Sequence, residues 1–199
     1  MSSPAVQGAA EPRGGAAPAP ANAAPQPVAD GALRSMTDAE LRSEAQRLLR
    51  AKDAAAARRA LEHLLARPLG VDDRARALAS LGSVHLRTGD DVAAEASLQQ
   101  AVDVLGVAGD EGAWATYELG LLASRREDFA QALRLGEQVA RAEGVSVWNR
   151  RHGRWLAATM REAMGDVDAA RREYRAMLAE CGDDPQFGWL VRDLTARLP

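Results

Sequence analysis

Residues 78–101 read LASLGSVHLRTGDDVAAEASLQQA, and this stretch decides the fold. Leucines and alanines recur at helical spacing on both sides of the Gly89-Asp90 pair. Glycine is favoured just past the end of a helix, and aspartate accepts hydrogen bonds from the free amides that begin one. The small residues Gly82, Ala94 and Ala101 stand where two such helices must touch. The stretch therefore predicts a helical hairpin with a tight turn.

Versions of this hairpin recur along the chain at a nearly constant interval. Ala57, Ala94, Ala132 and Ala170 stand early in four successive second helices, at intervals of 37, 38 and 38 residues. Such a period indicates a solenoid, in which each hairpin covers an apolar face of its neighbour. We predict four hairpins and a C-terminal capping helix, over residues 38–67, 73–105, 113–143, 146–181 and 185–198. The link 106–112 is predicted to be a loop.

Several helix starts carry side chains that can accept hydrogen bonds from backbone amides. Thr37 and Glu40 have the spacing of a capping box, in which the side chain of each residue accepts a hydrogen bond from the backbone amide of the other. Asp72 or Asp73 is predicted to cap the first helix of the second hairpin, and Ser146 the first helix of the fourth. Ordered structure is therefore predicted to begin near residue 36.

The N-terminal residues have a different composition. Residues 1–35 hold six of the nine prolines and almost no large apolar side chain. Because such a segment cannot bury enough apolar surface to offset its ordering entropy, we predict a disordered tail over 1–35 and a repeat domain over 36–199. The alternative, a Pro-rich docking segment, lacks the usual PxxP spacing and flanking charge.

The composition excludes several classes of function. The 199 residues carry a formal net charge of -3 with both signs interspersed, which argues against a nucleic-acid partner. No apolar run is long enough to span a bilayer and no secretory signal is recognisable, so a cytoplasmic location is predicted. Lys52 is the only lysine and isoleucine is absent, a bias typical of GC-rich bacterial genomes.

Catalytic and metal-binding motifs are missing from the sequence. His63, His85 and His152 fall in separate hairpins, and the single cysteine, Cys181, has none of them near it in sequence. No HExxH, CxxC, GxSxG or phosphate-loop pattern occurs. We therefore expect a non-enzymatic protein with no metal, cofactor or small-molecule substrate, and we expect His85 to be a packing residue.

The hairpin sequences resemble the tetratricopeptide repeat (TPR) family. The family pattern of a bulky residue, Leu-Gly, Tyr, Ala, Phe and Ala is matched in the second hairpin and in parts of the third and fourth. The matching residues are Leu78, Leu81-Gly82, His85, Gly89-Asp90, Ala94, Leu98 and Ala101, then Leu119-Gly120, Asp128-Phe129 and Ala132, then Gly165-Asp166, Ala170 and Tyr174. The resemblance covers residues 38–182 and implies an all-α, right-handed α-solenoid. The period departs from the family's 34 residues, so the loops are longer.

The TPR resemblance implies that a partner peptide or protein surface binds in a concave groove lined by the first helix of each pair. On this basis the candidate groove residues are Arg76, Ser83 and Arg87, then Trp114, Tyr117, Leu121 and Ser124, then His152, Trp155 and Thr159. We expect at least two of the four rings (Trp114, Tyr117, His152 and Trp155) to be exposed there. The alternative is that these rings pack between adjacent hairpins.

Three functions remain open from the sequence. The first is a protein-binding adaptor or scaffold, and the second is a small secretion-type chaperone for a client protein. The third is a homo-oligomer that assembles through the N-terminal end, where the apolar Leu41, Leu48, Leu61 and Leu65 have no obvious capping helix. The arginine clusters at residues 125–126, 150–154 and 171–175 are expected to be solvated helix faces paired with acidic residues.

Overall fold

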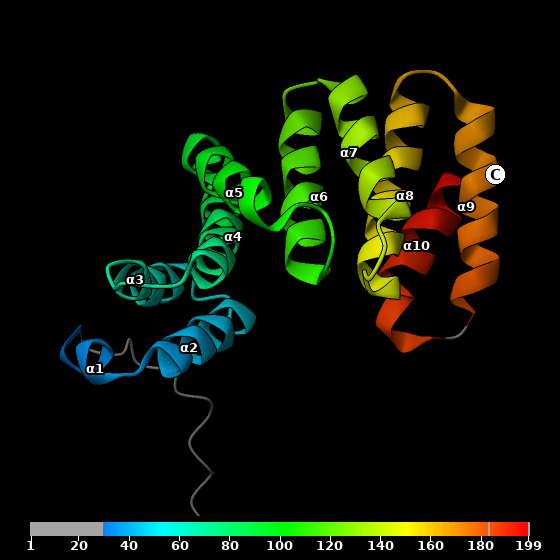
Figure 1. The fold of residues 1–199 in the computed structure, drawn as a ribbon. Coiled ribbons are helices and arrows are strands. Elements are labelled where there is room, and N and C mark those ends of the chain that lie inside the picture. Colours follow the sequence, from blue (N-terminus) through cyan, green and yellow to red (C-terminus); the bar gives the residue numbers. More distant parts are fainter. Residues whose placement is uncertain (1–29, 183, 199) are drawn as a thin grey trace, which may run out of the picture.

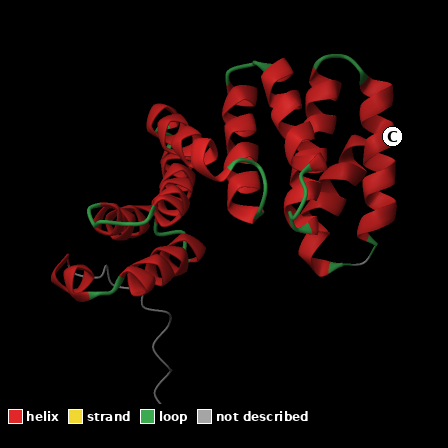
Figure 2. Cartoon of the chain, in the orientation of Figure 1, coloured by secondary structure: helices red, strands yellow, loops and turns green. Residues whose placement is uncertain are grey.

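A computed structural model describes residues 30–182 and 184–198 of the chain. Every regular element in these two ranges is a helix (Figure 1, Figure 2). The elements are α1 (Asp30–Ser35), α2 (Asp38–Arg50), α3 (Ala54–Leu65), α4 (Val71–Thr88), α5 (Asp91–Leu105), α6 (Asp110–Arg125), α7 (Phe129–Arg141), α8 (Val147–Ala163), α9 (Val167–Cys181), the 3-10 turn η1 (Pro185–Phe187) and α10 (Gly188–Arg197). The expected tail lies largely outside the described residues. None of the described helices is long and apolar enough to cross a membrane.

Consecutive helices pack as antiparallel pairs: α2 with α3, α4 with α5, α6 with α7, and α8 with α9. Each pair also contacts the next, so the hairpins follow one another in chain order from α2 to α9 (Figure 1). The all-helical class predicted from the sequence is therefore confirmed for the part of the chain that the structure describes.

All four hairpin turns share one local structure. The second helix of each pair begins with an aspartate whose carboxylate accepts a hydrogen bond from the backbone amide three residues later, at 3.0–3.2 Å. The residue before each aspartate has a left-handed backbone, with φ between 61° and 91°. The four pairs are Lys52-Asp53, Gly89-Asp90, Glu127-Asp128 and Gly165-Asp166. An αL residue followed by an aspartate cap thus ends one helix and starts the next.

Other helix starts agree only in part with the predictions. The capping box is present, because the Thr37 amide donates to Glu40 Oε2 at 2.6 Å and the Glu40 amide donates to Thr37 Oγ1 at 3.3 Å. Ser146 caps α8 as predicted. The predicted cap at Asp72 or Asp73 is wrong, because α4 already begins at Val71 and both aspartates lie in its first turn. There they still interact favourably with the helix dipole.

Two segments predicted to be irregular are helical. Residues 110–112 belong to α6, although the sequence placed them in a loop. Residues 30–35 form α1, although they were assigned to the tail. Leu33 of α1 is buried against the first hairpin, and this contact with a remote part of the chain stabilises a helix too short to form alone.

The N-terminal end is not an open apolar face. Leu41, Leu48 and Leu61 are buried in one cluster with Leu33 of α1, and Leu65 packs against it half-buried. The expectation that these leucines remain uncovered was therefore wrong. This finding removes the observation that motivated assembly through the N-terminal end.

The four repeat alanines mark the contacts within the hairpins. Ala57, Ala94, Ala132 and Ala170 are each fully buried. The α7–α8 contact is also close, because a β-carbon on Gly136 would lie 2.9 Å from the Ala157 amide nitrogen. Small residues at these points let helix backbones approach, and larger neighbours fill the space between them.

Candidate binding groove

One open groove lies across the first helices of the hairpins. It has a volume of about 440 Å³, and α2, α4, α6 and the start of α8 all contribute to it. Its lining residues are Leu49, Arg76, Ala79, Ser80, Ser83, Asp110, Glu111, Trp114, Ser146, Trp148 and Asn149. We refer to this set as the groove.

The groove is open because small residues face two indole rings. Ala79, Ser80 and Ser83 of α4 leave space that larger side chains would fill. Trp114 of α6 is half-buried, and Trp148 of α8 is 38% exposed. Indole rings offer a large contact area at a small entropy cost, so this geometry suits an inserted side chain.

A polar clamp holds the starts of α6 and α8 together beside the groove. Asp110 Oδ1 accepts hydrogen bonds from the Ser146 amide at 2.8 Å and from Asn149 Nδ2 at 2.9 Å. The same Asn149 nitrogen donates to the Asp110 carbonyl oxygen at 3.1 Å. These bonds, the Ser146 backbone bond first, lower the pKa of Asp110, so that its carboxylate is charged at neutral pH. The clamp fixes the distance between two walls of the groove.

Three of the ten residues predicted from the sequence line the groove: Arg76, Ser83 and Trp114. Arg76 lies within 3.6 Å of Asp73 and 3.9 Å of Glu111, so its charge has acidic neighbours. Arg87 lies outside the groove lining and is exposed, but its Nη1 donates to the Leu49 carbonyl oxygen at 3.0 Å and so links α4 to α2.

Tyr117 and His152 are buried and make no open surface. Their ring centroids lie 5.2 Å apart, and Trp114 lies 5.1 Å from Tyr117 and 5.4 Å from His152. Burial lowers the pKa of His152, which keeps the imidazole neutral, and its Nδ1 lies 2.9 Å from the Trp148 carbonyl oxygen. These two rings join α6 to α8 as packing residues. Of the three rings Trp114, Tyr117 and His152, Trp114 is the one that lines the groove.

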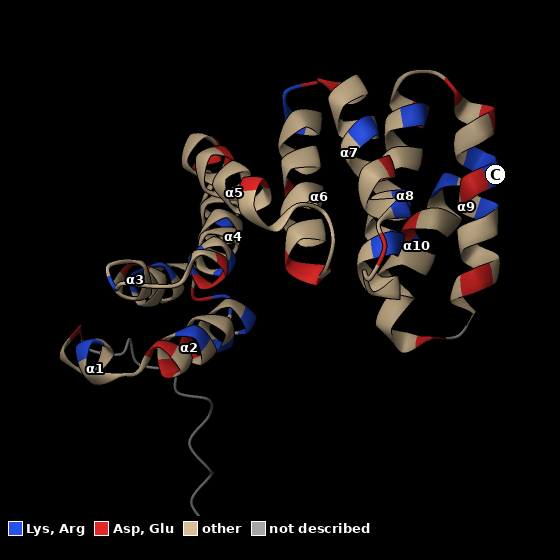
Figure 3. Cartoon of the chain, in the orientation of Figure 1, with Lys and Arg blue, Asp and Glu red and all other residues tan. Residues whose placement is uncertain are grey.

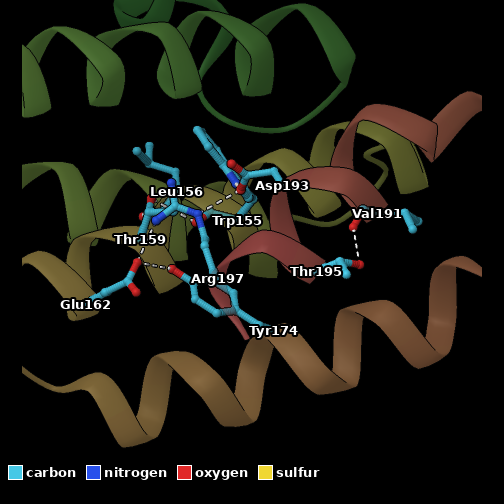
Figure 4. A network of polar contacts seen from close by, with 9 residues as sticks. All are labelled: Trp155, Leu156, Thr159, Glu162, Tyr174, Val191, Asp193, Thr195 and Arg197. Atoms are coloured by element: carbon cyan, nitrogen blue, oxygen red, sulfur yellow. Dashed lines mark hydrogen bonds and ion pairs between the residues drawn. The ribbon is translucent and has the colours of Figure 1, made fainter. Parts of the chain in front are cut away.

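The C-terminal helix covers the remaining α8 candidates. Trp155 Nε1 donates to Asp193 of α10 at 2.7 Å, and Arg197 of α10 donates to Glu162 of α8 at 2.6 Å (Figure 4). Thr159 is buried and donates to the carbonyl oxygens of residues 155 and 156 in its own helix. The expectation that Thr159 lines an open groove is therefore not met, and Trp155 is half-buried under α10.

The last two candidates lie farther along α6. Leu121 is half-buried and packs against the apolar cluster that includes Tyr117 and Leu156. Ser124 is half-buried near the end of α6, where its carbonyl oxygen accepts from the Glu127 amide in the turn. Neither residue lines the groove.

Sequence reasoning missed several groove residues. Trp148 stands four residues before His152, so helical spacing could have found it on the same face. Glu118 likewise follows Trp114 by four residues and lies behind the groove wall. Asp110 and Glu111 were missed because their segment was predicted to be a loop.

The arginine clusters are paired with acidic residues only in part, because three of their eight arginines form ion pairs within the described ranges. Arg154 forms ion pairs with Glu173 and Glu180, and Arg125 and Arg126 pair with Asp91 and Glu95 of α5. Acidic and basic residues are interspersed over the helices (Figure 3). No group of three or more His, Cys, Asp or Glu side chains in the described ranges could hold a metal ion.

Comparison with protein-family models, curated proteins and solved structures gave no match for this chain.

Proposed function

We propose that this chain is a non-enzymatic adaptor that binds a peptide or protein surface in the groove. The proposal rests on one observation: first helices from successive hairpins converge on an open hollow with aromatic walls and a floor of small residues. A hollow of this kind accepts the anchor side chain of a partner, and buried anchors supply most of the energy of such interfaces. A cytoplasmic location and a right-handed, TPR-type superhelix belong to the same proposal.

The local features of the repeat support a TPR-type arrangement. A β-carbon on Gly82 would lie 2.5 Å from Leu98 Cγ, so the second hairpin has its glycine where the family places Leu-Gly and where its two helices meet. Buried alanines recur at the matching position of each second helix. Solenoids built in this way present extended concave surfaces to their partners.

A pair of matched tryptophan substitutions tests the proposal. Ser80→Trp fills the groove floor, whereas Ala96→Trp adds the same ring at an exposed position on α5, away from the groove. Both full-length variants and the wild type would serve as baits in lysate of the source cells, after circular dichroism has shown that they fold alike. We expect a partner that is captured by the wild type and by Ala96→Trp, and lost by Ser80→Trp. A partner that binds all three baits equally would place binding elsewhere.

A further inference from the structure

A buried carboxylate lies directly behind the groove wall. Glu118 stands one turn after Trp114 on α6 and is only 7% exposed. Its Oε2 accepts a hydrogen bond of 2.6 Å from the hydroxyl of Ser83, and Ser83 itself lines the groove. One hydroxyl group therefore separates a buried acid from the open hollow.

Glu118 has no cationic partner in the described parts of the chain. No lysine, arginine or histidine nitrogen lies within the 4.0 Å of an ion pair, whereas Glu137 and Glu162 each have an arginine. Arg87 on α4 acts on the carboxylate through space, but its guanidinium is bound to the Leu49 carbonyl oxygen. Burial raises the pKa of Glu118 to about 7, because hydrogen bonding to Ser83 and Trp114 and the charge of Arg87 offset only part of the cost of desolvating its charge.

The surroundings of Glu118 suit an incoming cation. Trp114 presents an indole ring one turn away, and a cation over such a ring is attracted by its quadrupole. The groove lining holds two carboxylates, Asp110 and Glu111, against the single arginine Arg76. The two carboxylates belong to the acidic start of α6 (Figure 3). The hydrocarbon stem of a lysine or arginine could lie along the apolar wall while its charge reaches the acid.

We propose that the groove holds its partner through a lysine or arginine side chain, whose charge lies against the Trp114 ring and is attracted by the Glu118 carboxylate behind it. This inference rests on the function proposed above and specifies the chemistry of the partner. The cation packs against the Trp114 ring and provides the positive charge with which no described residue pairs Glu118. An acidic C-terminal tail would instead meet three carboxylates, which disfavours it.

Selection of random dodecapeptides displayed on phage tests this inference. The targets are the full-length wild type, Glu118→Gln, Glu95→Gln and the groove-filled Ser80→Trp, all at pH 8. Gln keeps the shape of Glu118 and can still accept from Ser83. Glu95, on α5, is an exposed carboxylate paired with Arg126, so Glu95→Gln is the matched control. We expect wild-type peptides to share a lysine or arginine at one position.

Titration of a selected synthetic peptide measures the coupling. Glu118→Gln should bind about tenfold more weakly than wild type or Glu95→Gln. Replacing the basic peptide residue by norleucine should weaken binding to wild type and change little in Glu118→Gln. The cation site would be overturned by selected peptides that share no basic residue, or by a peptide that binds Glu118→Gln as tightly as wild type. If such peptides still fail to bind Ser80→Trp, the groove remains the binding site. If wild type selects only peptides that Ser80→Trp also selects, both the cation site and the binding function of the groove are refuted.

Discussion

Glu118 illustrates how a single side chain can oppose folding. Its carboxylate lies between α4 and α6 and accepts a hydrogen bond from the Ser83 hydroxyl, and burial raises the pKa of Glu118 to about 7 from an ordinary value of 4.5. At a pH between these two pKa values, Glu118 keeps its proton in the folded chain but has released it in the unfolded chain. Stability from this group is therefore fully present below about pH 4.5 and declines as the pH rises through 7.

Glu118→Gln should remove this pH dependence. Above pH 7 we expect its unfolding free energy to exceed that of wild type by up to about 3 kcal/mol, since each pKa unit corresponds to about 1.4 kcal/mol. Near pH 4.5 the two proteins should differ little. Urea unfolding at pH 4.5, 6 and 8 measures the difference, with Glu95→Gln as the exposed control. A difference that is the same at all three pH values would contradict the assignment of the shift to Glu118.

The hairpin turn is the element that the chain repeats most faithfully. All four turns combine an αL residue with an aspartate cap, yet only Gly89 and Gly165 are glycines at the αL position. Lys52 and Glu127 adopt φ of 61° there with a side chain. A β-carbon in this conformation costs about 1–2 kcal/mol, so the first and third turns are strained relative to the second and fourth.

Removing a glycine from the αL position of one turn and adding a glycine at that position in another should change stability in opposite directions. We expect Gly165→Ala to lower the unfolding free energy by about 1 kcal/mol, because alanine is strained at φ of 91°. Glu127→Gly should raise it by about 0.5 kcal/mol, since relief of strain exceeds the added freedom of glycine in the unfolded chain. Thermal and urea unfolding of both variants give the comparison. Destabilisation by Glu127→Gly would show that its αL backbone carries no strain.

At the scale of the whole molecule, the C-terminal helix closes the end of the hairpin series. Leu190, Leu194 and Phe187 are buried with Tyr174 and Met177 of α9. Hydrogen bonds between Trp155 and Asp193 and between Arg197 and Glu162 attach α10 to α8 (Figure 4). In a chain of hairpins that contact only their neighbours, such an end cap stabilises the last hairpin most.

Truncation after Gly182 should therefore destabilise the molecule unevenly. Three buried side chains at about 2 kcal/mol each amount to a loss of about 6 kcal/mol at the C-terminal end. We expect hydrogen exchange to show lost amide protection in α8 and α9 but nearly unchanged protection in α2 and α3. Leu190→Ala/Leu194→Ala in the full chain should give the same pattern. Equal loss in every hairpin would mean that the molecule unfolds as one unit.

The features predicted correctly depend mostly on residues that are close together in the sequence. The Thr37–Glu40 capping box and the Gly-Asp turns act through residues three or four apart, so neighbouring letters suffice to recognise them. Helix α1 was not predicted because its six residues form a helix only when Leu33 packs against the first hairpin. Helical spacing places Trp148 on one face with His152 and Glu118 on one face with Trp114, but it does not show which of these faces stays open, because that depends on the helices packed against it.

The sequence by itself determined the helical class, the turns and the period of this protein, because backbone hydrogen bonding and apolar spacing are properties of short segments. Only the tertiary structure decided which predicted groove residues are open. Trp114 and Ser83 reach the groove, whereas Tyr117, His152 and Thr159 are buried and Trp155 lies half-buried under α10. The physical reason is that a helix face is buried or exposed according to what packs on it, and that partner can be 38 residues away, as Asp193 is from Trp155.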